Sequence, residues 1–239
     1  MPAELLVVIP VFNEERSVGF VLEEWTKELD RLGADYSILL IDDGSTDATP
    51  EVLHNWKRDH PAVRLEVMRH ANRGHGQTCL EGYRIACDRQ IPWVFQIDSD
   101  GQCDPAFFAA VWAARHGHDV VYGHRTKRED GLKRVLASVL VKAVVRAASG
   151  AECIDANVPY RLMRTENLHP LVDSIPSDFD LANIALAVQI KRAGWREAAV
   201  PIVFRPRAGG EPSVPVSRFA VKAWELSRQL DRLQSVPEL

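Results

Sequence analysis

Two aspartates one residue apart follow an apolar stretch in the middle of this chain. Asp98 and Asp100 come directly after Trp93–Ile97, a run of residues that suits a buried strand. Gly101 ends that strand, and Pro105 suits the first turn of a following helix. Two carboxylates this close repel each other unless a positive charge lies between them, and a divalent cation with oxygen ligands supplies one. Such a cation suits a substrate that carries a diphosphate.

Two other interpretations of the same residues stay open at this point. A solvated turn that is rich in Asp and Gly needs no function. An apolar strand followed by Asp-x-Asp-Gly also opens the haloacid-dehalogenase phosphotransferases, in which the first Asp is a nucleophile. That motif usually lies near the N-terminus, whereas here three strand-like segments come before it.

The elements that must position these aspartates alternate along the chain. Apolar stretches typical of strands lie at residues 5–9, 36–41, 63–68, 93–97, 120–122 and 200–204, and helical patterns lie between most of them. This alternation predicts an α/β fold with a mostly parallel sheet and helices on both of its faces. The carboxyl ends of parallel strands meet at one edge, where open α/β sheets bind ligands.

Composition limits the classes of function. The chain has 239 residues, 46% of them hydrophobic and 26% charged, with a net charge of −4, so we expect a soluble protein that does not bind nucleic acid. None of the four cysteines has C-x-x-C spacing, and we see no signal peptide, so we expect a reduced, cytoplasmic setting without zinc. No apolar run approaches the roughly 20 residues that span a bilayer.

Three motifs stand in an order that resembles a known family. Ile9–Glu14, Asp42–Asp47 and Asp98–Asp100 have the order and spacing of family 2 glycosyltransferases with a GT-A fold. Asp98–Gln102, followed by Tyr122–Arg125, is most similar to the dolichol-phosphate mannose synthase branch, which moves a sugar from a nucleotide onto a polyprenyl phosphate. The resemblance covers residues 5–207 and implies a metal-dependent, inverting glycosyltransferase.

The resemblance implies a donor site at the carboxyl edge of the sheet. Carboxylates at strand ends can accept hydrogen bonds from a nucleotide base and ribose. The implied nucleotide-binding residues are Pro10, Val11, Phe12, Glu14, Asp42, Asp43, Asp98 and Arg207. The implied ligands of Mg²⁺ or Mn²⁺ are Asp98, Asp100 and Gln102, and oxygen donors do not distinguish the two ions. The alternative for Asp42–Asp47 is a turn with a helix N-cap. Asn72–Gly76 is either a plain loop or a backbone that approaches phosphate.

A basic stretch points to an anionic acceptor. Residues 124–146 contain seven arginines and lysines against two acids. Within it, Arg125, Arg134 and Ser138 match the branch's residues that hold the acceptor phosphate, and an arginine fork suits phosphate. Leu132–Val144 is also apolar enough to suit a helix in a membrane interface, and a solvated basic helix face is the plain alternative.

The acceptor has a second interpretation. Asp155–Arg161 departs from the family's pattern near the expected acceptor position. Asp178 or Asp180 is then a candidate general base for a hydroxyl acceptor, unless this segment only caps the following helix. The candidate catalytic residues are therefore Asp100, Arg125, Asp178 and Asp180.

We therefore expect a GT-A-like domain over residues 1–210, and a mobile loop with an amphipathic helix over 211–239. The expected partners are a nucleotide-sugar donor, a polyprenyl phosphate or another acceptor, and a membrane surface or membrane protein. The expected location is cytoplasmic, at the inner face of the membrane. Many relatives continue into transmembrane helices where this chain stops. A non-catalytic nucleotide-binding protein is the remaining alternative.

Overall fold

The computed structural model describes residues 3–126, 146, 150, 156–179, 181–206, 228–230 and 232–233. The predicted alternation of strands and helices is confirmed. The elements are, in chain order, β1 (Leu5–Val11), α1 (Val18–Arg31), β2 (Tyr36–Asp42), α2 (Thr49–Asp59), β3 (Leu65–Arg69), α3 (His75–Asp88), β4 (Trp93–Gln96), η1 (Pro105–Phe107), α4 (Phe108–Ala114), β5 (Val120–Arg125), β6 (Arg161–Arg164), α6 (Leu168–Asp173), α7 (Ala182–Arg192) and β7 (Glu197–Ile202).

The strands form one seven-stranded sheet in the order β3-β2-β1-β4-β6-β5-β7. Strand β6 runs antiparallel to β4 and to β5, and the other pairings within the described sheet are parallel. Sequence periodicity did not predict β6, and it placed the last strand about three residues too late. Because β6 is antiparallel, the segment that precedes it arrives at the edge where β4 ends.

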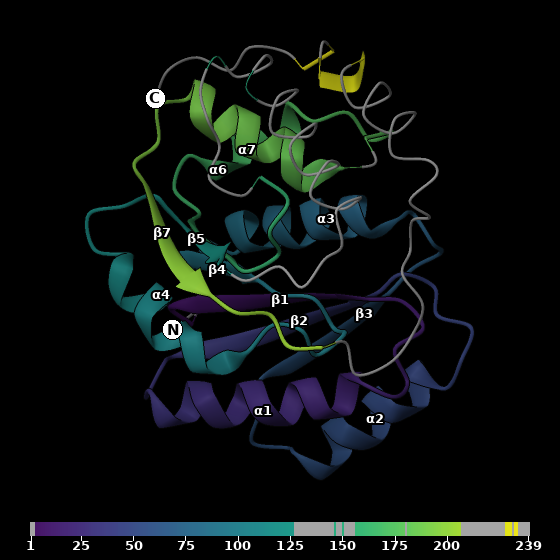
Figure 1. Ribbon diagram of the computed structural model, residues 1–239. Coiled ribbons are helices and arrows are strands. Elements are labelled where there is room, and N and C mark those ends of the chain that lie inside the picture. The colour runs from purple at the N-terminus through teal and green to yellow at the C-terminus, as the bar shows by residue number, and fades with distance from the viewer. Residues whose placement is uncertain are drawn as a thin grey trace.

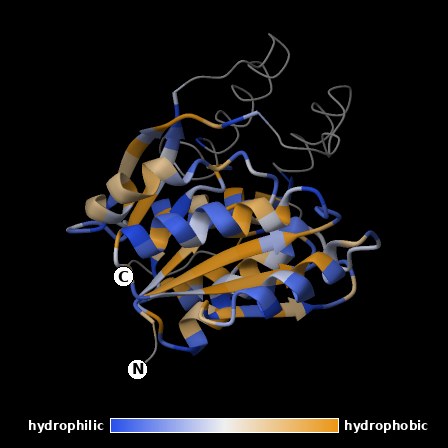
Figure 2. Cartoon of the chain, turned by 90° about the horizontal axis from the view of Figure 1, so that it is seen from below, coloured by the Kyte–Doolittle hydropathy of each residue, from blue (hydrophilic) through white to orange (hydrophobic). Residues whose placement is uncertain are grey.

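Helices cover both faces of this sheet (Figure 1). Helices α1, α2 and α4 lie on one side, and α3, α6 and α7 lie on the other. The central strands consist mostly of hydrophobic residues, and the helices mix hydrophobic with hydrophilic residues (Figure 2). Strands β1 and β2 are buried almost throughout, as expected for a parallel sheet that is covered on both faces. This mixed, mostly parallel arrangement confirms the predicted fold class.

An aromatic cluster packs around Phe95, near the end of β4. The Phe95 ring lies 5.4 Å from Trp25, 4.9 Å from Phe108 and 5.0 Å from Tyr160, measured between ring centroids. The Tyr160 hydroxyl donates to the carbonyl oxygen of Asp104 at 3.1 Å. Rigid aromatic packing of this kind fixes the loop that carries Asp98 and Asp100.

Two features concern the C-terminal part of the chain. Leu230 and Leu233, from the expected final helix, are buried against the core, but most of residues 207–239 lies outside the described residues. Within the described ranges, none of the helices combines the length and the hydrophobicity that crossing a membrane requires.

Candidate active site

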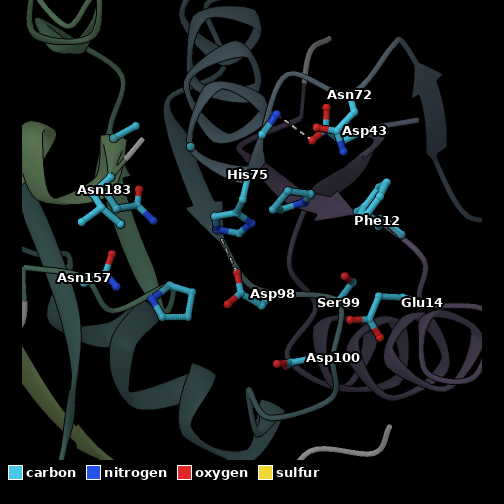
Figure 3. A pocket seen from close by; sticks show the side chains of 17 residues that line it. Phe12, Glu14, Asp43, Asn72, His75, Asp98, Ser99, Asp100, Asn157 and Asn183 are labelled. Atoms are coloured by element: carbon cyan, nitrogen blue, oxygen red, sulfur yellow. Dashed lines mark hydrogen bonds and ion pairs between the residues drawn. The ribbon is translucent and has the colours of Figure 1, made fainter. Parts of the chain in front are cut away.

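A cavity of about 540 Å³ opens at the carboxyl edge of the sheet. Loops that follow β1, β2, β3 and β4 meet there with the segment before β6 and the first turn of α7. The described lining residues are Pro10, Val11, Phe12, Glu14, Asp43, Asn72, Gly74, His75, Gly76, Asp98, Ser99, Asp100, Asn157, Pro159, Leu181, Ala182 and Asn183 (Figure 3). The structure thus brings the predicted β1, β2 and β4 motifs to one place.

The carboxylates of Asp98 and Asp100 both face this cavity. Asp98 lies near the middle of it, with 31% of its side chain exposed (Figure 3). Its Oδ1 accepts a hydrogen bond from Gln96 Nε2 at 3.0 Å. Asp100 is 8% exposed, and its Oδ1 accepts from the Gln102 backbone N–H at 3.0 Å. A neutral donor therefore helps to hold each side chain, and His75 Nε2 lies 3.6 Å from the same Asp98 oxygen.

Gln102 has a different environment from the two aspartates. It is not among the described residues that line the cavity, and its Nε2 donates to the Arg205 carbonyl oxygen at 3.2 Å. Arg205 in turn pairs with Glu24 at 2.6 Å and with Asp104 at 2.8 Å. In this structure Gln102 joins the loop after β7 to the loop after β4, and its place in the ligand set stays a prediction.

The chemistry of the donor set fits a hard divalent cation. Among the described residues there is no cluster of three or more His, Cys, Asp and Glu side chains that could hold a metal ion. A cation such as Mg²⁺ is usually bound by one or two carboxylates together with substrate phosphates. Asp98 and Asp100 provide such a pair, and the cavity beside them leaves room for the phosphates.

The end of β1 supplies one side of the cavity. Phe12 keeps 46% of its surface exposed there, which is unusual for a large aromatic side chain. Glu14 is nearly buried, and its Oε2 accepts from Ser17 Oγ at 2.6 Å. Pro10 and Val11 complete this side. All four predicted residues of the first motif therefore reach the cavity.

The two aspartates after β2 are separated by the structure. Asp42 is not among the described lining residues, and its carboxylate accepts from the Ser45 backbone N–H at 2.8 Å and lies 3.2 Å from Arg69 Nε. Asp43 does line the cavity. Its two oxygens accept the backbone N–H groups of Arg73 at 2.7 Å and Gly74 at 2.9 Å. Asp43 thus holds the loop between β3 and α3.

That loop, Asn72–Gly76, is part of the site. Gly74 has φ 90°, a conformation that glycine adopts at little cost, and this lets the loop turn over the Asp43 carboxylate. Asn72, Gly74, His75 and Gly76 line the cavity, which favours the second of the two sequence-based interpretations of this segment.

His75 was not predicted as a site residue. Its Nε2 lies 3.5 Å from Cys79 Sγ and 3.6 Å from Asp98 Oδ1 (Figure 3). The Cys79 sulfur and then the Asp98 carboxylate raise the pKa of the His75 imidazole above its ordinary value, which favours the protonated form. An otherwise acidic cavity thereby gains a basic side chain. A histidine that follows Gly at a helix start gave only a weak sequence signal.

The wall of the cavity opposite Phe12 is made of residues that lie far from the first four strands in the sequence. Asn157 and Pro159 come from the segment before β6, and Leu181, Ala182 and Asn183 come from the start of α7 (Figure 3). Asn157 and Pro159 fall in the stretch that departs from the family pattern. Asn183 carries no sequence signal, because its position depends on how α7 packs on α3.

Other predicted residues lie elsewhere. Arg125, at the end of β5, stacks 5.4 Å from the Phe204 ring centroid and is not among the described lining residues. Asp178 is also outside that set, with 62% of its side chain exposed and Arg232 at 2.9 Å. That ion pair lowers the pKa of Asp178. Arg134, Ser138, Asp180 and Arg207 lie outside the described residues.

Known glycosyltransferases have sequences similar to this one. A family model described as glycosyl transferase family 2 matches residues 6–146. The undecaprenyl-phosphate 4-deoxy-4-formamido-L-arabinose transferases of Aeromonas hydrophila subsp. hydrophila and Pectobacterium carotovorum are 33% and 31% identical over 159 residues. Each match covers 66% of this chain and 48% of the relative, so the chain spans about half the length of these curated relatives.

Solved structures share the fold over nearly the whole chain. Glucosyl-3-phosphoglycerate synthase from Mycobacterium tuberculosis, in complex with Mn²⁺, UDP and glucosyl-3-phosphoglycerate, superposes with a TM-score of 0.68 at 18% identity, covering 98% of this chain and 81% of that one. A mannosyltransferase from Pyrobaculum calidifontis, in complex with GDP-mannose and Mn²⁺, gives 0.63 at 20% identity, covering 99% and 66%. These neighbours confirm the GT-A fold.

Proposed function

Because this chain belongs to glycosyl transferase family 2, we propose that it transfers a sugar from a nucleotide-sugar donor to a polyprenyl phosphate. The observation that carries the proposal is the position of Asp98 and Asp100 in one cavity, between an exposed aromatic side chain and a wall of amides. Family membership also sets aside the haloacid-dehalogenase interpretation, in which Asp98 would be a nucleophile.

The nucleoside of the donor is proposed to lie at the Phe12 end of the cavity. An exposed aromatic ring offers a stacking surface to any base, with a contribution of about 1–3 kcal/mol. Glu14 and Asp43 flank this surface and carry oxygens that accept hydrogen bonds. Phe12 accepts purines and pyrimidines alike, so the base is left to experiment. Asp42 and Arg207 stay in the proposal as residues implied by the family resemblance.

The diphosphate is proposed to lie beside Asp98 and Asp100, whose carboxylates would hold a divalent cation. Mg²⁺ and Mn²⁺ both suit these ligands, and Gln102 is the proposed third protein ligand. When bound, the cation acts as a Lewis acid that neutralises the leaving nucleoside diphosphate. The solved neighbours that contain Mn²⁺ with UDP or GDP-mannose support this part of the proposal.

The sugar is then proposed to lie on the far side of the two aspartates from Phe12, because a sugar and a nucleoside are attached to opposite ends of one diphosphate. Asn157 and Asn183 line that side and offer amide donors and acceptors of the kind that hydrogen-bond sugar hydroxyls. Pro159, Leu181 and Ala182 add an apolar surface. This wall contains no charged side chain among the described residues, which suits a neutral sugar.

The proposed acceptor is a polyprenyl phosphate. The curated relatives named undecaprenyl-phosphate transferases support this choice over about half of their length. A phosphate monoester with a second pKa of about 6 is largely ionised at neutral pH and needs no general base. It needs positioning instead, which we assign to Arg125, Arg134 and Ser138. The basic and apolar residues of the 124–146 segment also support contact with the inner face of a membrane from the cytoplasm.

The test is release of nucleoside diphosphate from a panel of nucleotide sugars, with Mg²⁺ or Mn²⁺ and with undecaprenyl phosphate as acceptor. We expect one donor to be used, and turnover to stop in excess chelator and to return with added cation. Absence of turnover with every donor, despite nucleotide binding, would favour the non-catalytic alternative.

The acceptor is tested with Arg134→Ala, beside Lys142→Ala from the same basic stretch as a matched control. Arg134→Ala should lower acceptor-dependent turnover by about tenfold to a hundredfold, as expected for a lost charge-assisted hydrogen bond, and should leave slow donor hydrolysis in place. Equal turnover in the two variants would contradict a phosphate acceptor held by Arg134.

A further inference from the structure

Buried amide side chains form a chain of hydrogen bonds that ends at Asp98, on the protein side of the cavity. Gln96, the last residue of β4, is fully buried, and its Nε2 donates to Asp98 Oδ1 at 3.0 Å. Its Oε1 accepts from Asn183 Nδ2 at 3.1 Å and lies 3.4 Å from the Tyr83 hydroxyl. The chain therefore runs from the first turn of α7, through the end of β4, to the carboxylate at the centre of the cavity.

Each group in this chain has one orientation. Burial raises the pKa of Tyr83 well above its ordinary value, so its hydroxyl stays protonated and donates to Asn183 Oδ1 at 2.9 Å. The Asn183 amide must then present its NH₂ group to Gln96, and Gln96 must present its own NH₂ group to Asp98. A buried amide turned the other way would place two acceptors or two donors against each other, at the cost of an unsatisfied buried group.

A fully buried arginine fixes the far end. Arg161 Nη1 donates to the Asn183 carbonyl oxygen at 3.0 Å, and Nη2 donates to the Ala156 carbonyl oxygen at 2.7 Å. Arg161 thereby joins the start of α7 to the segment that carries Asn157. The two bonds offset part of the cost of burying the guanidinium, whose Nε has no hydrogen-bond partner among the described residues, and they hold Asn183 in one position relative to β4.

The choice of an amide beside Asp98 is itself informative. A lysine or arginine at position 96 would orient the carboxylate but would also neutralise it. A neutral amide donor holds Oδ1 in place without adding positive charge to that of His75, whose Nε2 lies 3.6 Å from the same oxygen. Bonds of this kind to a metal-binding carboxylate typically affect metal affinity or activity by about 10- to 100-fold.

We propose that Gln96 is a positioning residue that holds Asp98 in the orientation in which its carboxylate binds the divalent cation, and that Tyr83 and Asn183 fix the Gln96 amide. The inference rests on the proposed function, since it assigns a metal to Asp98. Because Asn183 also lines the cavity, the same chain couples the amide wall to the centre of the site.

The experiment measures binding rather than turnover. Calorimetry gives the Kd of UDP and of GDP with and without saturating Mn²⁺, and the ratio of the two values is the metal-dependent gain. The variant is Gln96→Met, which keeps the shape of the side chain and removes the donor. The matched control is Gln189→Met, because Gln189 is equally buried and its Nε2 donates to Ser174 Oγ at 2.6 Å, away from the cavity.

We expect Gln96→Met to lose about 10- to 100-fold of the metal-dependent gain, while its metal-free Kd stays within about two-fold of wild type. Gln189→Met should lower the melting temperature and keep the full gain. A full gain in folded Gln96→Met would overturn the inference. A wild type that gains nothing from Mn²⁺ would instead contradict the proposed metal site, so the two failures are distinguishable.

Tyr83→Phe keeps the test decisive if Gln96→Met does not fold. It removes one hydroxyl from the chain and leaves Gln96 in place. We expect it to lose about two- to five-fold of the metal-dependent gain, as for one neutral hydrogen bond. An unchanged gain in Tyr83→Phe, with Gln96→Met unfolded, would overturn the inference.

Discussion

Two pairs of aspartates follow parallel strands at the same edge of the sheet, and the protein uses them differently. At the end of β2, Asp42 and Asp43 are almost completely buried. The Ser45 backbone N–H donates to Asp42 Oδ1, whose Oδ2 lies 3.2 Å from Arg69 Nε, and the N–H groups of Arg73 and Gly74 donate to the two oxygens of Asp43. After β4, Asp98 and Asp100 each accept one hydrogen bond at Oδ1 and face the cavity. The first pair organises loops, whereas both members of the second pair line the cavity.

The backbone at each strand end explains part of this difference. Adjacent residues in an extended chain point to opposite sides. Asp42 is the last residue of β2 and meets Arg69, while Asp43 meets the Arg73–Gly74 backbone, and the two carboxylates are separated. Asp98 and Asp100 instead lie beyond the last residue of β4, where the chain turns, and they line one cavity together with Ser99 between them.

The largest effect is expected where the charge faces the cavity. Asp100→Asn keeps an oxygen for the Gln102 N–H and removes the charge. We expect turnover to fall by about 10²–10³-fold, as for other lost electrostatic contacts in active sites. The melting temperature should change little, because the hydrogen bond is kept. Turnover assays with added Mn²⁺, together with thermal unfolding, check this. Near-wild-type turnover would show that the second pair is as structural as the first.

Asp43→Asn should mainly lower the stability of the fold, in contrast to Asp100→Asn, which should mainly lower turnover. The new NH₂ group would face the N–H of Arg73 or Gly74, so one buried hydrogen bond to a charged group is lost. That loss costs about 1.5–3 kcal/mol of unfolding free energy. For a chain of this size it lowers the melting temperature by roughly 3–12 °C. Nucleotide affinity should also fall, because the Asn72–Gly76 loop lines the cavity.

Calorimetry and thermal unfolding of Asp43→Asn separate its two effects. If affinity falls without any loss of stability, the carboxylate acts on the nucleotide directly, as the family resemblance implies. If stability falls with unchanged affinity, the carboxylate serves the loop alone. A variant that is unchanged in both would contradict the contrast between the two pairs.

The sequence was sufficient for the general plan of the molecule. Apolar periodicity located most strands, and the motifs after β1, β2 and β4 predicted which edge carries the site. It was insufficient for β6, a short antiparallel strand that lies between β4 and β5 although it follows β5 in the chain. The order of strands in space depends on long-range packing, which has no period in the sequence.

The roles of single side chains were harder to predict than their positions. Gln102 and Asp43 occur where the family pattern puts them, yet their side chains bond to the protein's own backbone. Gln96, Asn183 and Arg161 gave no signal, because a buried polar network is recognised only when its members are brought together. Arg161 even belongs to the segment that departs from the family pattern.

Asp42→Asn should have a smaller effect on stability than Asp43→Asn, and it tests whether the first pair of aspartates binds nucleotide. Its Oδ1 can still accept from Ser45, and the lost contact is with Arg69, a half-exposed partner that can turn to solvent. We expect a loss of about 0.5–1 kcal/mol in unfolding free energy, measured by urea denaturation. Nucleotide affinity should stay within about two-fold, as for a residue outside the cavity lining. A tenfold or greater loss of affinity would return Asp42 to the nucleotide site.

The smallest effect is expected for Asp178→Asn, which tests a third kind of aspartate. The Arg232 guanidinium lies at 2.9 Å and holds the pKa of Asp178 below its ordinary value, and a carboxylate with a lowered pKa is a weaker base. Because Asp178 is also outside the described cavity lining, acceptor-dependent turnover should change by less than about two-fold.

A hydroxyl acceptor predicts the opposite result for this segment. A lost general base typically costs about 10²–10⁴-fold in turnover, far above the change expected for Asp178→Asn. Asp180→Asn, assayed beside it, covers the other candidate base. If either variant is inactive while Arg134→Ala is active, the acceptor is deprotonated by an aspartate, and the Asp98–Asp100 pair serves the donor alone. If both variants stay active while Arg134→Ala loses acceptor-dependent turnover, the acceptor is an ionised phosphate that needs positioning and no general base. The aspartates that the reaction requires are then those after β4, Asp98 and Asp100.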